Sequence, residues 1–371
     1  MDPPLCRTAL MSQNGCHEFR HIIHPQEASP VNQHIRVLGI DIAKQVFHLV
    51  GMDGRGTVVL RKRLYRSQLM AFITTLPPAV IGMEACGGAH DWARRFREHG
   101  HEVHLMPPQF VKPYVKANKN DMRDAEAMAE AVTRPTMRFV PIKSVAQQDI
   151  QAWHRVRTRL LKARTALIHE ARGLLLEYGI VVPPGALTFR KHLLATLAAN
   201  DAKLTPMSRV LFQQLAEELA ALEDRLTRSD TQLTQLARHH PVCQRLMTIP
   251  GLGELTATAL VAAVSDAAQF NNGRQFTAWL GLVPRQHRSG GKARLLGISK
   301  RGDRYLRTLL VHGARSCLRW VDRQRDRRSQ WARSLLERRG WNRAAVALAN
   351  KNARVAWVLL RTDQVYCAVE A

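Results

Sequence analysis

The sequence has no apolar run of about 18 residues, the minimum for a membrane-spanning helix, and no basic amphipathic anchor. Its N-terminus lacks the apolar stretch of a secretory signal, and its six cysteines show no CxxC spacing. These absences predict a protein without a membrane partner that works in a reducing cytoplasm. A group of N-terminal residues also matches no common zinc pattern, which argues against a zinc site there: Cys6, Cys16, His17, His21 and His24.

Acidic residues are scarce relative to basic ones. The 371 residues include 30 Asp plus Glu and 55 Lys plus Arg, for a formal charge of +25, while 46% of the residues are hydrophobic. The hydrophobic content indicates a folded chain rather than a disordered one. The positive excess favours a polyanion, because each phosphate neutralised by Lys or Arg releases counterions. Composition therefore predicts a nucleic-acid-binding protein, with a membrane surface as the weaker alternative.

Short β-like runs begin at Ile35. Three strands in hairpin connection are predicted by the runs IRVLGI, VFHLVGM and TVVLRKRL, with Asp53-Gly54 as the turn signal between the second and the third. A helix over 67–76, the strand AVIGMEA, a helix over 90–99 and the strand HEVHLM follow. The order βββαβα is typical of an RNase H-like mixed α/β sheet. After it, the basic loop QFVKPYVKANKN leads into a helix at DMRDAEAMAEAVTR.

Two long helical stretches follow, over 145–178 and 208–238, separated by Pro183-Pro184-Gly185. The second has an apolar heptad pattern that predicts a coiled-coil seam for self-association, with an ordinary core helix as the alternative. Its a and d positions are Phe212, Leu215, Leu219, Leu222, Leu226, Leu233 and Leu236, with Ser229 the one polar d. We therefore expect a poorly ordered leader over 1–34, an RNase H-like domain over 35–145, long helices with a coiled coil over 146–240, and a mainly helical C-terminal domain over 241–371.

The C-terminal part carries two signals of nucleic-acid binding. The first is a Gly-x-Gly turn between two helical stretches in LMTIPGLGELTATALVAAV. Helix-hairpin-helix modules have such a turn, and its backbone N–H groups contact phosphates. A simple αα turn is the alternative. From Arg285 to Arg343 the chain has 18 Lys or Arg against four acids, with three tryptophans interleaved. The candidate nucleic-acid-binding residues, including those of the basic loop, are Lys112, Lys116, Lys119, Arg285, Arg288, Lys292, Arg294, Lys300, Arg301 and Arg304.

Four carboxylates lie at positions where their negative charge costs free energy unless a cation or hydrogen bonds offset it. Asp41 lies inside the apolar run GIDIAK, and Glu84 ends the apolar run IGMEA. Asp121 and Asp124, three residues apart at the start of a helix, share one face of it. Helix capping explains such acids one at a time, but four converging carboxylates repel one another and need a divalent cation. All-oxygen ligation without a nearby Cys or His predicts Mg²⁺ or Mn²⁺, and two such ions would clamp the oxygens of a phosphodiester displacement.

Ser289 precedes Gly290-Gly291-Lys292, and this segment predicts a flexible loop. The surrounding cations suit a serine nucleophile, because positive charge stabilises a pentavalent phosphate and favours the alkoxide. A serine that only grips a phosphate in a turn is the alternative. The cations are Arg285, Arg288, Lys292 and Arg294.

Several segments together resemble the DEDD-type insertion-sequence transposases, the recombinases guided by a bridge RNA: GIDIAK, GMEACGGAH, KANKNDMRDAEAMAEAV, IPGLG and WLGLVPRQHRSGGKARLLGISKRGDRYLRTLLVHGA. The resemblance begins after the leader, and the long C-terminal block is its most specific part. It implies a RuvC-like N-terminal domain, a coiled-coil linker and a C-terminal transposase domain. By motif, it implies that Asp41, Glu84, Asp121 and Asp124 bind metal and that Ser289 forms a transient phosphoserine link to DNA.

The resemblance also implies composite sites, in which one subunit supplies the acidic domain and another the serine domain. Such a protein would act as a dimer or tetramer on structured guide RNA and two DNAs, in the nucleoid of a bacterial cell. The leading hypothesis is therefore a Mg²⁺-dependent DNA recombinase. Two alternatives stay open: a RuvC-like junction nuclease without covalent serine chemistry, and a basic nucleic-acid-binding protein with a vestigial site.

Overall fold

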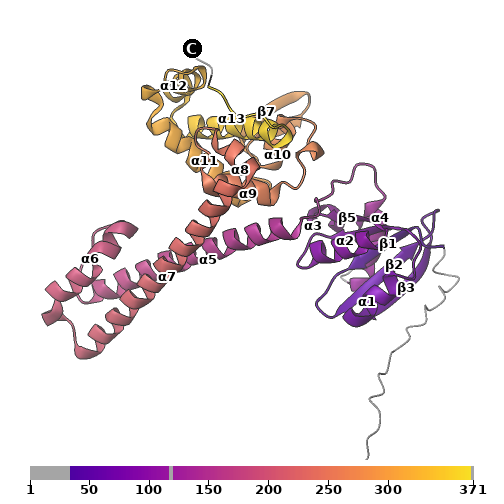
Figure 1. Cartoon of the computed structure of the whole chain (residues 1–371), viewed down its shortest axis with the longest axis horizontal. Coiled ribbons are helices and arrows are strands. Elements are labelled where there is room, and N and C mark those ends of the chain that lie inside the picture. Colours follow the sequence, from indigo (N-terminus) through magenta and orange to yellow (C-terminus); the bar gives the residue numbers. More distant parts are fainter. Residues whose placement is uncertain (1–33, 117–119, 369–371) are drawn as a thin grey trace, which may run out of the picture. The chain divides into compact units, whose positions relative to one another are not determined.

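The computed structural model describes residues 34–116 and 120–368. Residues 1–33 of the predicted leader, with their cysteines and histidines, and Lys119 lie outside these ranges. The chain divides into two compact units, residues 1–140 and residues 141–371 (Figure 1). The first unit contains a sheet, and the second is mainly helical.

The first unit is built on a five-stranded mixed sheet of order β3-β2-β1-β4-β5. β2 pairs antiparallel with β1 and β3, while β4 is parallel to both β1 and β5. The strand and helix order is the predicted βββαβα, and the predicted mixed α/β class of the N-terminal domain is confirmed. The strands are β1 (Val37–Asp41), β2 (Val46–Met52), β3 (Val58–Tyr65), β4 (Val80–Glu84) and β5 (Glu102–Met106).

The two faces of the sheet follow from the alternation of side chains along each strand. Ile40 on β1 and Phe47 on β2 are fully buried, and Phe47 packs edge-on against Trp92 of helix α2 with ring centroids 5.3 Å apart. Helix α4 packs against β1, β2 and β4. The helices of this unit are α1 (Arg66–Ile73), α2 (Ala89–Glu98), α3 (Pro108–Val111) and α4 (Asp121–Val132), with a 3₁₀ turn η2 (Lys112–Tyr114).

The second unit begins with a pair of long helices, α5 (Val145–Glu177) and α7 (Pro206–His239), joined through α6 (Ala186–Ala199) and the 3₁₀ turn η3 (Asp201–Lys203). Most of the apolar heptad positions of α7 are buried against α5 and α6: Phe212, Leu219, Leu222 and Leu226. The seam predicted for self-association is therefore occupied by the chain's own helices, which favours the core-helix alternative in this conformation.

The rest of the second unit is a helical core in which glycines allow a close approach. A Cβ on Gly313 would lie 1.8 Å from the carbonyl oxygen of Gly251, so the IPGLG turn lies directly on α11. The buried Arg328 guanidinium and the Asn352 amide both donate hydrogen bonds to the Pro250 carbonyl, at 3.2 and 3.0 Å. Packing thus accounts for this turn, and its contact with phosphates stays a prediction. The helices are α8 (Pro241–Met247), α9 (Glu254–Ala263), α10 (Gly273–Trp279), α11 (Arg304–Arg319), α12 (Arg327–Arg339) and α13 (Trp341–Arg361), with 3₁₀ turns η4 (Ala267–Gln269) and η5 (Val321–Arg323).

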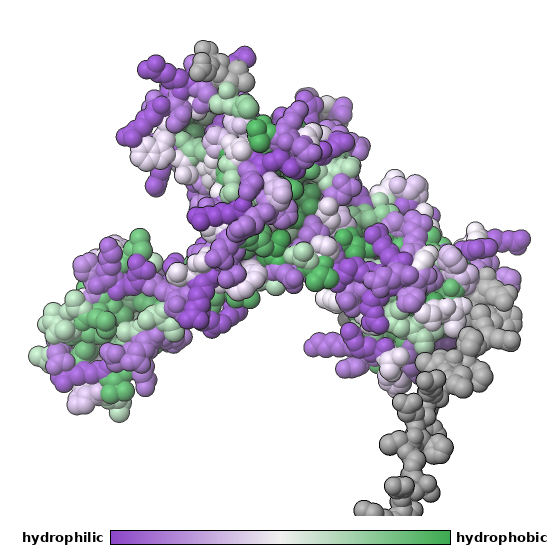
Figure 2. Space-filling view, viewed as in Figure 1, coloured by the Kyte–Doolittle hydropathy of each residue, from purple (hydrophilic) through white to green (hydrophobic). Residues whose placement is uncertain are grey.

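Apolar side chains are exposed at the end of the long helices where α6 meets α7 (Figure 2). Leu187 and Leu194 on α6 are 66% and 59% exposed, and Met207 and Val210 on α7 are 84% and 59% exposed. Several exposed apolar side chains gathered at one end of a helix pair suggest a contact site more strongly than a single exposed leucine does. Within the described ranges, none of the helices combines the length and apolarity needed to span a membrane.

Candidate active site

Helix α4 can lie close to the sheet because two strand residues facing it are glycines. A Cβ on Gly39 would lie 2.0 Å from a carbonyl oxygen of α4, and one on Gly82 would lie 2.8 Å from an α4 side chain. Asp41 and Glu84 each follow one of these glycines by two residues, so they face α4 as well. The local sequences GID and GME therefore combine a packing residue with an acid on the same face of the sheet.

The four predicted acids lie near one another at the C-terminal ends of the central strands β1 and β4. Asp41 and Glu84 end the neighbouring parallel strands β1 and β4, and Asp121 and Asp124 lie in the first turn of α4. Burial raises the pKa of the Asp41 carboxyl to about 6, with the charges of Asp121, Asp124 and Glu84 acting in the same direction and His48 opposing them. Burial and the charge of Asp124 also raise the pKa of Glu84. The acids are thus within electrostatic reach of one another.

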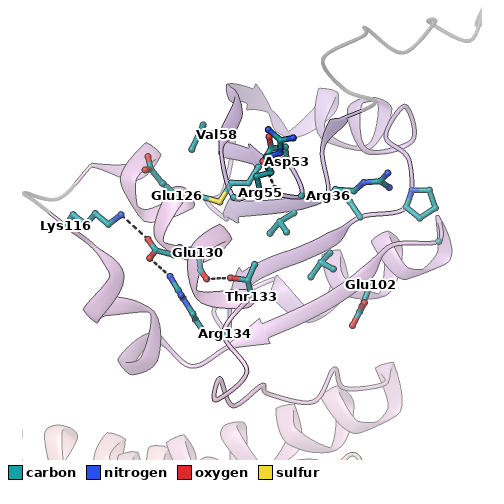
Figure 3. Close-up of a pocket in the computed structure, with 18 residues that line it drawn as sticks. Arg36, Asp53, Arg55, Val58, Glu102, Lys116, Glu126, Glu130, Thr133 and Arg134 are labelled. Carbon is teal, nitrogen blue, oxygen red and sulfur yellow. Dashed lines mark hydrogen bonds and ion pairs between the residues drawn. The ribbon is translucent and has the colours of Figure 1, made fainter.

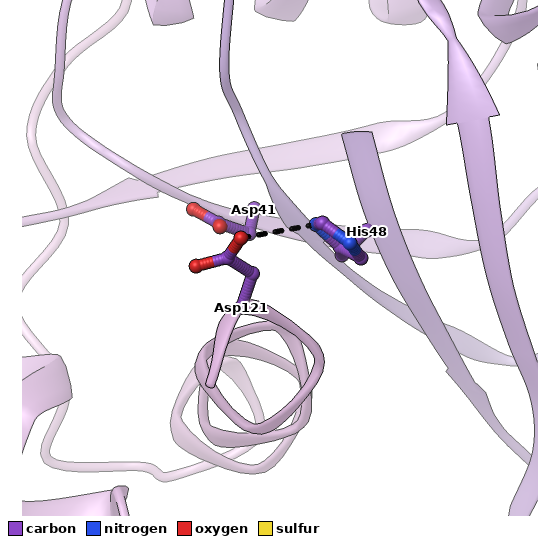
Figure 4. Close-up of side chains that lie close together, drawn as sticks. All are labelled: Asp41, His48 and Asp121. Atoms are coloured by element: carbon purple, nitrogen blue, oxygen red, sulfur yellow. Dashed lines mark ion pairs between the residues drawn. The ribbon is translucent and has the colours of Figure 1, made fainter. Parts of the chain in front are cut away.

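A histidine joins the acids. His48 lies directly opposite Asp41 in the β1–β2 register, and its Nδ1 is 3.8 Å from Oδ2 of Asp121 (Figure 4). One ligand atom from each of these three residues lies within 4.8 Å of the others. The prediction that no histidine stands near the acids is wrong, because it considered only neighbours along the chain. The strand register, which pairs position 41 with position 48, was the signal that would have revealed it.

This donor set fits a divalent cation. Burial is the largest cause of the raised pKa of Asp41, and the charges of Asp121, Asp124 and Glu84 add to it, so a bound cation would favour the ionised carboxylate. Two donors that share one ion at about 2.1 Å each lie at most about 4.2 Å apart. One donor atom from each of the three residues lies within 4.8 Å of the others, so small side-chain adjustments bring them to one ion. Asp41, His48 and Asp121 would hold one ion, and Glu84 and Asp124 offer carboxylates for a second.

A cavity of about 910 Å³ lies at the opposite end of the strands (Figure 3). Its lining includes Val37 and Val80, the first residues of β1 and β4, and none of the four predicted acids. Glu130 of α4 accepts ion pairs there from Lys116 Nζ at 3.2 Å and Arg134 Nη2 at 2.7 Å. Lys116, a candidate for nucleic-acid binding, is therefore engaged by a carboxylate in this structure.

Ser289 ends strand β6 (Pro284–Ser289), which pairs antiparallel with β7 (Lys292–Ile298). Gly290 and Gly291 connect the strands with φ values of 55° and 78°. A two-residue hairpin turn of the type favoured by strand twist requires positive φ at both positions, which glycine adopts without strain. The structure therefore replaces the predicted loop with a β-hairpin that the two glycines close, and the flexibility of this segment stays a prediction.

The hairpin register gives Ser289 specific neighbours. Ser289 pairs with Lys292, and His287 pairs with Arg294 on the next rung of the same face. All four side chains are exposed. One face of the hairpin therefore carries a hydroxyl, an imidazole and two cations. His287 was not among the predicted site residues, although its position two residues before Ser289 in a strand would have placed it on this face.

The other predicted basic residues are exposed and lie along both units. Exposed ammonium and guanidinium groups are the usual partners of phosphate oxygens. They are Lys112 in the turn that follows α3, Arg285 and Arg288 on β6, Lys300 and Arg301 after β7, and Arg304 at the start of α11. The acids belong to the first unit, and Ser289 belongs to the second.

Known proteins resemble the chain over both units. A family model described as the transposase of the IS116/IS110/IS902 family matches residues 243–330, and a model of DEDD-type IS110 transposases matches residues 38–180. A probable family 20 transposase of Pseudomonas aeruginosa is 51% identical over 89% of this chain and 98% of its own length. The transposase for insertion sequence element IS1111A of Coxiella burnetii is 46% identical over 99% of both chains. The transposase for IS1328 of Yersinia enterocolitica is 40% identical over 90% of this chain and 98% of its own length.

Proposed function

Because this chain belongs to the IS116/IS110/IS902 family of transposases, enzymes that cut and rejoin DNA, we propose that it moves an insertion element by covalent serine chemistry together with a metal site. Ser289 is the nucleophile, and Asp41, Glu84, Asp121 and Asp124 hold the metal. The observation that carries this proposal is the coexistence of a converged acid cluster with an exposed serine on a cationic hairpin face.

The acids hold Mg²⁺ or Mn²⁺, which when bound neutralises charge on a phosphodiester undergoing displacement. The remaining work falls to the chain's own residues. Asp41 and Glu84 are fixed by two central strands, and Asp121 and Asp124 by the first turn of α4. A site built on regular elements keeps its donors in place before substrate arrives, which is the condition for electrostatic stabilisation of a transition state.

The serine step is a displacement at phosphorus. The Ser289 Oγ attacks the phosphate, an O–P bond forms to serine, and the bond from phosphorus to a deoxyribose oxygen breaks. The hydroxyl proton passes to the imidazole of His287 on the same face, and the leaving oxygen takes up a proton. Lys292 and Arg294 offset the negative charge that develops on the phosphate. Attack by a hydroxyl of a second strand then reverses these bond changes, rejoins DNA and frees the serine.

The test is a Ser289→Ala substitution in the full chain. We expect strand cleavage and exchange to fall below detection while binding to DNA persists, because only the nucleophile is lost. Ser316→Ala, which removes an exposed hydroxyl from α11, serves as the matched control and should recombine normally. Normal strand exchange by the Ser289→Ala variant would contradict the serine role.

A metal-dependent junction nuclease is the second candidate, favoured by the fact that the acid cluster is assembled entirely within the first unit. In that case water is the nucleophile and Ser289 only contacts phosphate. A nicked or otherwise trapped DNA substrate separates the two candidates. A covalent protein–DNA adduct at Ser289 supports the recombinase, and cleavage without any adduct supports the nuclease.

The partners we propose are donor and target DNA, a structured guide RNA and further copies of this chain. The +25 formal charge supports polyanionic partners. The exposed apolar surface of α6 and α7 supports self-association in place of the heptad seam. Replacing Leu187 and Met207 with Glu should lower the oligomeric state measured by light scattering, and an unchanged mass would exclude this surface as the contact.

A further inference from the structure

We infer that His48 is a direct ligand of the metal site and that it gives the site a preference for Mn²⁺ over Mg²⁺. The inference rests on the proposed metal-binding role of the acids and names which ion that site selects. It adds a nitrogen donor to a site that the four carboxylates alone would make all-oxygen.

The geometry allows the imidazole, which is at ion-pair distance from Asp121, to bind an ion together with that carboxylate. The separation of 3.8 Å between Nδ1 of His48 and Oδ2 of Asp121 is longer than a hydrogen bond. It lies within the span of about 3 to 4.3 Å expected for two donors that share one ion at about 2.1 Å each. In Figure 4 the side chains of His48, Asp41 and Asp121 lie close together, and they come from β2, β1 and α4.

The sheet holds His48 in this position. Its neighbours Phe47 and Leu49 are fully buried on the opposite face, and the strand pairs with β1 on one side and β3 on the other. A shift of one residue would move His48 to the other face and carry Phe47 and Leu49 to the face that α4 covers, so the register is strongly specified. The imidazole is therefore held at the site whether or not an ion is bound.

The chemistry of the donors determines the ion. Mg²⁺ is a hard cation that prefers oxygen ligands and gives up its water reluctantly, whereas imidazole nitrogen suits transition-metal ions. Between these two ions, a site of two carboxylates and one imidazole favours Mn²⁺, because exchanging an oxygen donor for nitrogen weakens Mg²⁺ binding more than Mn²⁺ binding. Removal of His48 should accordingly weaken Mn²⁺ binding strongly and Mg²⁺ binding little.

The first experiment uses the full-length wild-type chain loaded with Mn²⁺ and pulsed electron paramagnetic resonance. A directly bound imidazole gives a ¹⁴N coupling to the Mn²⁺ electron spin. We expect that coupling in the wild-type protein and its loss in His48→Gln. A wild-type spectrum without ¹⁴N coupling would overturn the inference, and this measurement does not depend on the folding of any variant.

The second experiment measures Mn²⁺ and Mg²⁺ affinities by calorimetry. We expect His48→Gln to weaken Mn²⁺ binding by more than about 10-fold, because losing even an outer-shell partner of a ligand costs about 10- to 100-fold, and Mg²⁺ binding by less than about threefold. His104→Gln is the matched control, because His104 lies in the same sheet at a similar side-chain exposure and contacts the Glu102 carboxylate at 2.8 Å. Its affinities should equal those of wild type.

The outcomes separate this inference from the proposed function. Equal losses of Mn²⁺ and Mg²⁺ affinity in His48→Gln would overturn the nitrogen-ligand inference while leaving the acid site intact. A wild-type chain that binds neither ion, with or without DNA, would overturn the metal site itself. Unequal losses together with the ¹⁴N coupling support both.

Discussion

Replacing Asp41 with Asn should stabilise the metal-free protein, because the buried carboxylate is held among like charges. Its pKa is raised from 3.8 to about 6. A group that binds its proton more tightly in the folded state contributes full stability below pH 3.8 and loses that contribution as the pH rises through about 6. At pH 8 the shift corresponds to about 3 kcal/mol of lost stability, or about 2 kcal/mol after allowance for partial exposure of the side chain.

Hydrogen exchange of the β1 and β4 amides measures this effect, because it reports the opening free energy of the first unit without a signal from the second. In EDTA at pH 8, Asp41→Asn should raise that free energy by about 2 kcal/mol, and the gain should shrink toward zero as the pH falls to about 4. Mg²⁺ at about 100 times its dissociation constant should stabilise only the wild-type protein, by about 2.7 kcal/mol. The wild-type protein should then be more stable than Asp41→Asn, the reverse of the result in EDTA.

Asp53→Asn provides a control for which the expected change in stability has the opposite sign. Hydrogen bonds from the backbone of Thr57 and Arg55 lower the pKa of this exposed turn carboxyl, so its loss should destabilise the protein at pH 8 with no dependence on Mg²⁺. The reasoning about the acid cluster would be refuted if Asp41→Asn left the metal-free stability unchanged at pH 8. It would also be refuted if that variant gained as much from Mg²⁺ as the wild-type protein does.

Three further predictions follow from the site. Gly39→Val should lower the free energy of unfolding by about 3 kcal/mol or more and abolish metal binding in calorimetry, because the new side chain displaces α4 and its acids. A metal affinity equal to that of wild type would contradict this account. His287→Ala should slow strand cleavage about 10²- to 10⁴-fold in single-turnover assays if His287 accepts the serine proton, whereas Gln286→Ala, on the other face, should not. Binding to duplex DNA should weaken with salt by a log-log slope of about −0.9 per phosphate neutralised, and a slope near zero would remove the charge argument.

The elements that could be predicted were those with a strong local pattern. The apolar strands of the first unit and the helix beginning at Asp121 follow from side-chain alternation and from the acids at a helix start. The convergence of Asp41 and Glu84 followed from their places at the ends of buried strands. Family resemblance, rather than the residues alone, pointed to Ser289 as more than a phosphate contact.

The features that sequence patterns missed depended on strand register and on which partner a helix faces. His48 enters the site only through the β1–β2 register, and the heptad stripe of α7 has the same pattern whether it faces α5 or a second chain. Helix α6 has little amphipathic signal because apolar residues lie on several sides of it, Leu187 and Leu194 among those exposed. The hairpin at Ser289 was missed because its strands have no buried face to impose alternation.

The two halves of the proposed chemistry differ in how they are held. The acids rest on central strands with fully buried neighbours such as Leu38 and Met83, so the proposed metal site would be preorganised. The serine hairpin has six exposed residues in β6, and Leu295 of β7 is 70% exposed. A two-stranded hairpin without a packed face is marginally stable in water. Phosphates bound to its cationic face, and a partner surface packed against Leu295, would supply the missing stabilisation. Ser289 would thus be positioned only in the assembled complex, which would keep a reactive nucleophile idle until both DNA strands are in place.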